Sequence, residues 1–248
     1  MNRVNAKISG QSPPESPKIG TLNEKPLHAA LKEWYAQPGD RFEVLVDGYV
    51  VDIVRGDLLV EIQTGGFSSL KRKLAVLTEG HRLRLVYPVA REKWLRKMAP
   101  DGHGQTERRK SPRRGGLEDV FHELVSFPAL LANPHFSVEV LLIQEEETRR
   151  YEGGRHWRRR GWVVESRNLL EVVERRLFET PADMVALLPG DLSEPFTTGG
   201  LAAAMGRPRR LAQRMAYCLR AMGAIKVVGK CRRALLYTRA EPSKTTGL

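Results

Sequence analysis

The chain has 248 residues, with 41 Lys and Arg against 29 Asp and Glu, and a formal net charge of +12. It contains no run of about eighteen apolar residues that could span a bilayer, and residues 1–20 lack the apolar core of a signal peptide, so we expect a cytoplasmic protein without membrane contact. Cys218 and Cys231 are too few for a disulfide framework and have no partners at zinc spacing. The positive charge favours a nucleic-acid partner.

The first elements are a lead-in and a helix. Residues 1–20 are rich in proline and serine and are predicted to be disordered. A helix is predicted over 22–36, with Leu27, Leu31 and Trp34 on its apolar side. Pro38, Gly39 and Asp40 end it.

Short β-branched runs separated by turn signals follow this helix. Asp47-Gly48 and Arg55-Gly56-Asp57 are typical of tight turns between antiparallel strands. The predicted elements are strands over 42–46, 49–54 and 58–63, a helix over 68–79 and a strand over 83–89. This order of helix, three strands, helix and strand defines a predicted domain over 21–98.

The middle of the chain is less regular. Glycine, proline and basic residues predict an exposed basic linker or loop over 99–116. Residues 117–190 are predicted to form a connecting subdomain, separate from the first domain or part of it. Its predicted elements are a helix over 117–131, a strand over 136–144, a charged loop or ribbon over 145–160, a return strand over 162–166 and one or two helices over 169–188.

The final portion, 191–240, is predicted to contain two helices followed by a two-stranded hairpin, before a tail over 241–248. Between Phe196 and Arg239 there are ten basic residues and no Asp or Glu, which is typical of a phosphate-binding surface. Polar and basic side chains at the second helix and at the hairpin are the predicted DNA contacts. They are Arg207, Arg209, Arg210, Gln213, Arg214, Lys230, Arg232 and Arg233.

The runs "FTTGGLAAAMG" and "LAQRMAYCLRAMGAIKVV" resemble winged helix-turn-helix domains over about forty residues. The resemblance implies a recognition helix for the DNA major groove and a wing for the flanking backbone. DNA is therefore the expected partner, and RNA remains an alternative. The same fold also mediates protein contacts, in which case the positive face would simply be solvated.

Two acids form a second candidate site. If the strands over 49–54 and 58–63 form a hairpin turning at Gly56, Asp52 lies opposite Val60 and beside Glu61. Neighbouring carboxylates repel each other unless a cation holds them, and their oxygens suit Mg²⁺ or Mn²⁺. The alternative is that both acids belong to the solvated face of an antiparallel sheet.

The segment "VVDIVRGDLLVEIQTGGFSSLKRKL" resembles the PD-(D/E)xK, or restriction-endonuclease-like, nuclease superfamily in the form D-x8-E-x-Q. The resemblance implies an α/β (α+β) fold with an αβββαβ core. It implies that Asp52, Glu61 and the carbonyl of Ile62 bind the metal. A Glu from the first helix would support the metal, and here it would be Glu24 or, less well placed, Glu33.

The sequence departs from the superfamily at Gln63, where lysine is usual. A glutamine can orient water but cannot neutralise charge. Lys71 in the next helix is the predicted substitute that contacts the scissile phosphate, and Lys73 is the weaker candidate. The expected function is therefore a metal-dependent deoxyribonuclease, which could act as a homodimer. The alternative is a non-catalytic DNA-binding transcription regulator or assembly factor whose nuclease-like domain is a degenerate scaffold.

Overall fold

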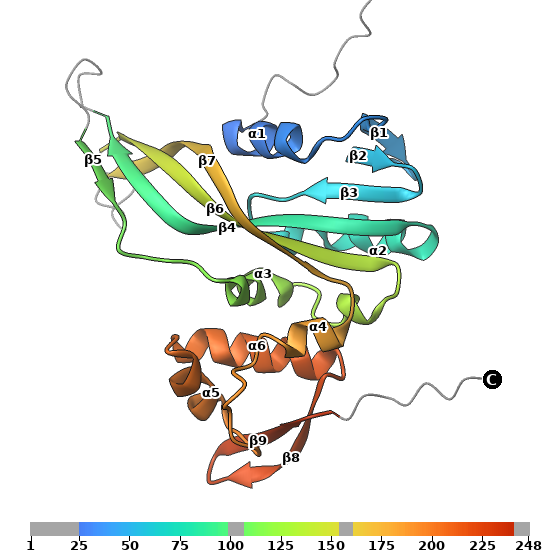
Figure 1. Cartoon of the computed structure of the whole chain (residues 1–248), viewed down its shortest axis with the longest axis vertical. Coiled ribbons are helices and arrows are strands. Elements are labelled where there is room, and N and C mark those ends of the chain that lie inside the picture. The colour runs from blue at the N-terminus through green and yellow to red at the C-terminus, as the bar shows by residue number, and fades with distance from the viewer. Residues whose placement is uncertain (1–24, 99–106, 154–160, 241–248) are drawn as a thin grey trace, which may run out of the picture.

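The computed structural model describes residues 25–98, 107–153 and 161–240 as a mixed α/β structure (Figure 1). The predicted lead-in 1–20 and tail 241–248 lie outside the described residues. Within the described ranges, no helix is long and apolar enough to cross a membrane.

A seven-stranded mixed sheet forms the larger part of the molecule, in the order β1-β2-β3-β4-β6-β7, with β5 paired to the far end of β4. The strands are β1 (Arg41–Val46), β2 (Tyr49–Arg55), β3 (Leu58–Ile62), β4 (Arg82–Lys97), β5 (Glu107–Lys110), β6 (Phe136–Tyr151) and β7 (Trp162–Phe178). The β3–β4 and β4–β6 pairs are parallel, and the remaining pairs are antiparallel. Parallel neighbours require crossover connections, and these bring helices onto the sheet.

Helices cover both faces of the sheet (Figure 1). On one face α1 (Pro26–Tyr35) buries Leu27 and Leu31 against Val60 and Ile62. On the other face lie η2 (Phe67–Leu70), α2 (Lys71–Gly80), η3 (Leu117–Val120), α3 (Phe121–Leu124) and η4 (Leu130–Ala132). The sheet is therefore the middle layer between two apolar cores.

The elements from α1 to β4 follow the predicted order of helix, three strands, helix and strand. Asp47 and Gly48 both have positive φ, 48° and 80°, as a two-residue type I′ turn requires. β4 runs to Lys97, well past its predicted end at Val89, because the charged residues of its second half pair with glutamates of β6. Lys93 contacts Glu145 and Glu147 there.

Two helix predictions need correction. The apolar stripe of α1 consists of Leu27, Leu31 and Tyr35 at four-residue spacing, whereas Trp34 is 44% exposed. The single helix predicted over 117–131 is divided among η3, α3 and η4. Pro128 accounts for the break before η4, because proline disfavours helical backbone in the residue before it.

The helices predicted over 169–188 are largely wrong. β7 continues to Phe178, and only α4 (Pro181–Val185) is helical in the described structure of this segment. Register shifts in the β6–β7 pair leave one extra residue at Leu170 and another at Val173. These bulges place Leu169 and Val172, three residues apart, on the same core below α1. Buried residues three positions apart are typical of a helix, which explains why the sequence predicted one here.

Parts of the segments predicted as linker and ribbon belong to the same sheet. Within 99–116, residues 107–110 form β5. The ribbon predicted over 145–160 is present as the ends of β6 and β7, and its tip at 154–160 lies outside the described residues. β6 and β7, the long strands of the predicted connecting region 117–190, thus complete the large sheet.

The remaining elements form the C-terminal module, which we define as residues 181–239. It comprises α4, α5 (Thr198–Met205), α6 (Arg209–Ala221), β8 (Ile225–Cys231) and β9 (Ala234–Arg239). The Thr197 hydroxyl accepts a hydrogen bond from the Gly200 amide and caps α5. Gly206, with φ 59°, ends α5 in the left-handed conformation that glycine favours.

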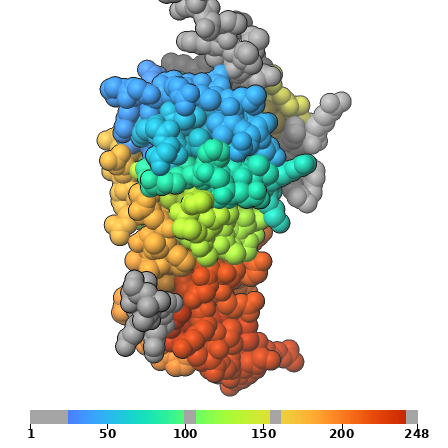
Figure 2. Space-filling view, turned by 90° about the vertical axis from the view of Figure 1, so that its right-hand side faces the viewer, coloured from blue at the N-terminus to red at the C-terminus, as the bar shows by residue number. Residues whose placement is uncertain are grey.

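The C-terminal module packs directly against the sheet domain, which we define as the described elements from α1 to β7, and Figure 2 shows the module at one end of the molecule. A single apolar core includes Phe121 and Leu124 of α3 together with Leu211 and Met215 of α6. All four side chains are at most 1% exposed. The two parts are therefore joined by a shared core.

Candidate functional site

Asp52 of β2 and Glu61 of β3 lie on neighbouring antiparallel strands. The sequence predicted that Asp52 lies opposite Val60. In the structure Ile53 pairs with Val60, so Asp52 aligns with Glu61. The Asp52 side chain reaches across to β3, where the Ile62 amide donates a 2.7 Å hydrogen bond to its Oδ2 atom. Glu61 is only 6% exposed. The two carboxylates therefore share one largely buried region.

His28 on α1 is the second contact of Asp52. Its Nε2 atom lies 3.2 Å from Asp52 Oδ2. Burial alone would raise the pKa of Asp52, but the hydrogen bond and charge of His28, together with the Ile62 amide, hold this pKa below its ordinary value. Asp52 is consequently ionised at neutral pH.

Glu61 has the opposite electrostatic character. Burial and the nearby charge of Asp52 raise the pKa of Glu61 to about 7, although Lys73 opposes this increase. Lys73 Nζ lies 2.5 Å from Glu61 Oε2, in an ion pair without well-aligned hydrogen-bond geometry. The same ammonium donates to the Val50 carbonyl at 2.7 Å. The acidic pair therefore carries one strongly ionised carboxylate and one that is partly protonated near pH 7.

The oxygens of this pair suit a hard divalent cation. The Ile62 amide and His28 both reach Oδ2 of Asp52, and Lys73 lies beside Oε2 of Glu61. The described ranges contain no group of three or more His, Cys, Asp and Glu side chains that could hold a metal ion. The groups that could offer oxygen ligands to a divalent cation here are the two carboxylates and the Ile62 carbonyl, and water would have to complete the coordination.

The remaining predicted residues of this site occupy different positions. Gln63 donates from Nε2 to the Gly66 carbonyl at 2.9 Å and so supports the turn after β3. Lys71 is exposed, whereas Lys73, two residues further along α2, reaches Glu61. Glu24 lies outside the described residues. The lysine preferred from the sequence is thus not the one that contacts the acids.

A cleft of about 760 Å³ opens beside Asp52, between the start of α1 and the first half of β7. Its lining includes Asp52 and Gln63 and several cationic side chains. Those cations are Lys25, His28, Lys32 and Arg167. Arg167 is held by two hydrogen bonds to Glu145 Oε2 and one to the Thr64 carbonyl. The lining also includes Glu43 and Glu165, and Lys32 forms an ion pair with Glu43, so the cleft carries charges of both signs around Asp52.

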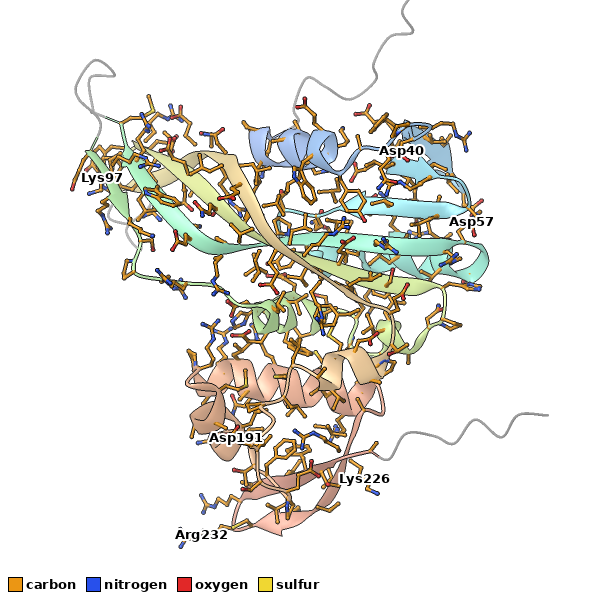
Figure 3. All side chains as sticks on the ribbon, in the orientation of Figure 1. Asp40, Asp57, Lys97, Asp191, Lys226 and Arg232 are labelled. Carbon is orange, nitrogen blue, oxygen red and sulfur yellow. The ribbon has the colours of Figure 1, made fainter. Side chains whose placement is uncertain are left out.

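The predicted DNA contacts of the C-terminal module divide into two groups. Arg207 pairs with Glu118 and Asp119, and Arg214 donates to the His122 carbonyl. These two arginines face the sheet domain and fasten the module to it. The other predicted residues are exposed: Arg209, Arg210, Gln213, Lys230, Arg232 and Arg233. Figure 3 shows Arg232 pointing away from the body at the end of the hairpin.

Sequence reasoning missed His28 and Arg167 and ranked Lys73 too low. No local pattern in the sequence pointed to His28, because its contact with Asp52 depends on the packing of α1 on the sheet. A signal did exist for Lys73: it is three residues from Leu70 and four from Leu77, so it lies near the buried side of α2. No sequence pattern brings Arg167 to this cleft, since its position depends on the pairing of β6 with β7.

Comparison with known proteins gives the family. Residues 25–179 match the model described as "Domain of unknown function (DUF8091)". The chain belongs to this family. The matched region runs from the start of α1 to one residue beyond β7, so the DUF8091 domain corresponds to the sheet domain and excludes the C-terminal module.

The chain is also similar to a protein of Treponema pallidum (strain Nichols) that is described as an uncharacterized protein. The two are 32% identical over 185 residues, which cover 74% of this chain and 73% of the relative. No solved structure matches the chain.

Proposed function

We propose that the protein is a metal-dependent deoxyribonuclease in which the DUF8091 domain has a restriction-endonuclease-like core and the C-terminal module is a winged helix-turn-helix that binds DNA. The observation that carries this proposal is that Asp52 and Glu61 lie side by side on neighbouring strands, with Lys73 paired to Glu61 and a cleft beside Asp52 that also contains Lys25 and Arg167. The order α1-β1-β2-β3-α2-β4 is compatible with such a core.

In this proposal Asp52, Glu61 and the Ile62 carbonyl hold Mg²⁺ or Mn²⁺. A divalent cation stabilises charge on the phosphate and lowers the pKa of bound water. His28 and the Ile62 amide fix the position of the Asp52 carboxylate. Lys73 supplies the positive charge that Gln63 cannot, because its ammonium lies beside Glu61. Lys25 and Arg167 attract the substrate backbone to the cleft.

The test is incubation of supercoiled plasmid with the purified protein and Mn²⁺, beside an EDTA control and the Glu61→Ala variant. Nicking should require both the metal and Glu61. A matched lysine pair sharpens the assignment: Lys73→Met should reduce the rate at least tenfold, whereas exposed Lys71→Met should change it little. Melting temperatures of all variants establish that each one is folded.

Plasmid that is bound but not cut by the wild type would contradict the nuclease proposal and favour a non-catalytic DNA-binding regulator. Equal activity of Glu61→Ala and wild type would contradict the site. Loss of activity in Lys71→Met but not in Lys73→Met would restore the assignment that the sequence favoured.

A further inference from the structure

A groove of about 380 Å³ lies between α6 and the β8–β9 hairpin, outside the DUF8091 domain. Its volume falls within the range of about 300–1,000 Å³ that is usual for ligand sites. Part of the wall is apolar, formed by Ala234, Leu235 and Tyr237, and the remainder is polar or cationic. None of the described residues that line it is acidic.

One face of α6 forms the long wall of this groove. Arg209, Gln213, Tyr217 and Arg220 follow one another at spacings of four, four and three residues, which places them along a single side of the helix. Arg233 lies across from them on the hairpin. Within the described part of the chain, Arg209, Arg220 and Arg233 form no ion pair, in contrast to Arg207.

Tyr217 is the distinctive residue of this wall. It is 49% exposed although it is a large aromatic residue, and Gln213 and Arg220 flank it on the helix. Aromatic side chains within cationic grooves bind single-stranded nucleic acid, because a base stacks on the ring while arginines contact the phosphates. The bases of an intact duplex are already stacked and cannot offer a face to Tyr217.

The side of α6 that carries these residues forms one wall of the groove, and the hairpin forms the other. A single strand with unpaired bases can lie along such a groove and place a base against Tyr217.

We infer that this groove binds a nucleic-acid strand with an unpaired base stacked on Tyr217, and that Arg209, Arg220 and Arg233 contact its phosphates. The inference rests on the proposed nucleic-acid binding, for which it names the substrate class, but it is independent of cleavage. It adds Tyr217 and Arg220 to the contacts predicted from the sequence.

The test is fluorescence anisotropy of a labelled oligothymidylate in EDTA at fixed salt, so that no cleavage can occur. The wild type should bind this single strand more tightly than a duplex of equal length. Tyr217→Ala should weaken single-strand binding roughly 5- to 100-fold, the effect of losing one stacked base, while Tyr217→Phe should stay within about twofold. Comparison with an oligouridylate of the same length shows whether the groove prefers DNA or RNA.

A charge-matched pair tests the position of the phosphates. Arg220→Ala and Arg210→Ala each remove one exposed cation from α6, but only Arg220 lines the groove. Arg220→Ala should weaken binding more. A strand containing 5-iodouracil should, on irradiation, crosslink to the peptide that contains Tyr217.

Unchanged affinity of Tyr217→Ala would overturn the inference, as would equal loss in Tyr217→Phe or tighter binding of the duplex. Because the assay excludes divalent metal, these outcomes do not depend on whether the plasmid is nicked. A protein that binds the strand but never cuts DNA would retain this inference and lose the proposed nuclease activity.

Discussion

At the scale of single residues, the feature with the clearest consequence is the unequal ionisation of Asp52 and Glu61. Asp52 accepts hydrogen bonds from His28 and the Ile62 amide and is near the positive charge of Lys73. These interactions lower its pKa although it is largely buried. Glu61 is more deeply buried, the charge of Asp52 acts against its ionisation, and its pKa rises to about 7. The free energy of the folded state should therefore depend on the proton of Glu61.

The sign of this dependence can be stated. The folded chain keeps the Glu61 proton up to about pH 7, whereas the unfolded chain loses it near the ordinary value of 4.5. Between these values the folded state binds more protons, so stability falls as pH rises. Relative to Glu61→Gln, the wild type should lose at most about 3 kcal/mol of unfolding free energy across this window.

Urea unfolding of both proteins at pH 4.5, 6 and 7.5 in EDTA measures the difference. Asp52 does not confuse the comparison, because its lowered pKa places its own titration below this window. Parallel pH profiles for the two proteins would show that Glu61 is ionised normally.

At the scale of elements, the segment before η3 shows how a glycine can be required by close packing. Gly115 approaches β4 so closely that its amide donates to the Ala90 carbonyl at 2.9 Å. A Cβ atom there would lie 2.6 Å from Val89 Cγ1 and 2.7 Å from the Ala90 carbonyl oxygen. The basic segment is thus fixed to the sheet at this point.

Gly115→Ala should destabilise the fold by about 1–3 kcal/mol, because a backbone atom must shift to remove the overlap. Gly190→Ala is the matched control, since no atom lies within 4 Å of its Cβ position and its φ is not positive. The control should change stability by less than about 1 kcal/mol. Thermal melting of both variants tests this, and equal melting temperatures would contradict the close approach.

The sequence predicted some of these elements well and others poorly, for local reasons. Turn chemistry at Asp47-Gly48 and the periodicity of α1 depend on neighbours in the chain, so the first half of the sheet domain was predictable. β7 was not, because its bulges at Leu170 and Val173 exist only in the pairing with β6. Asp52 and Glu61 were found from one hairpin, whereas His28 and Arg167 reach the cleft through tertiary packing.

At the scale of the whole molecule, the shared core and a set of polar contacts join the C-terminal module to the DUF8091 domain. Arg207 lies 2.5 Å from Asp119 and 3.1 Å from Glu118, and Arg214 donates to His122. Arg207 and Arg214, which resembled DNA contacts in the sequence, thus serve the interface. We expect the two parts to unfold in one cooperative transition.

A double-mutant cycle on Arg207→Ala and Asp119→Ala tests this interface. The two side chains should show a coupling energy of about 0.5–3 kcal/mol, because they contact each other directly. Arg210→Ala, an exposed position on the same helix, should leave stability nearly unchanged. Additive effects of Arg207→Ala and Asp119→Ala would contradict the coupling of these two side chains. Two separate calorimetric transitions would contradict cooperative unfolding of the two parts.

The core that continues from Phe121 and Leu124 into Leu211 and Met215 has a consequence for the products of the proposed reaction. A module attached by a flexible linker would let the cleft cut at many distances from the bound segment. Here the groove beside Tyr217 lies on the C-terminal module, Asp52 and Glu61 lie in the sheet domain, and the two parts share one apolar core. The distance between the groove and the two acids is therefore fixed. A duplex whose only unpaired bases lie at one end should therefore be cut within a narrow range of distances from that end, which a sequencing gel measures.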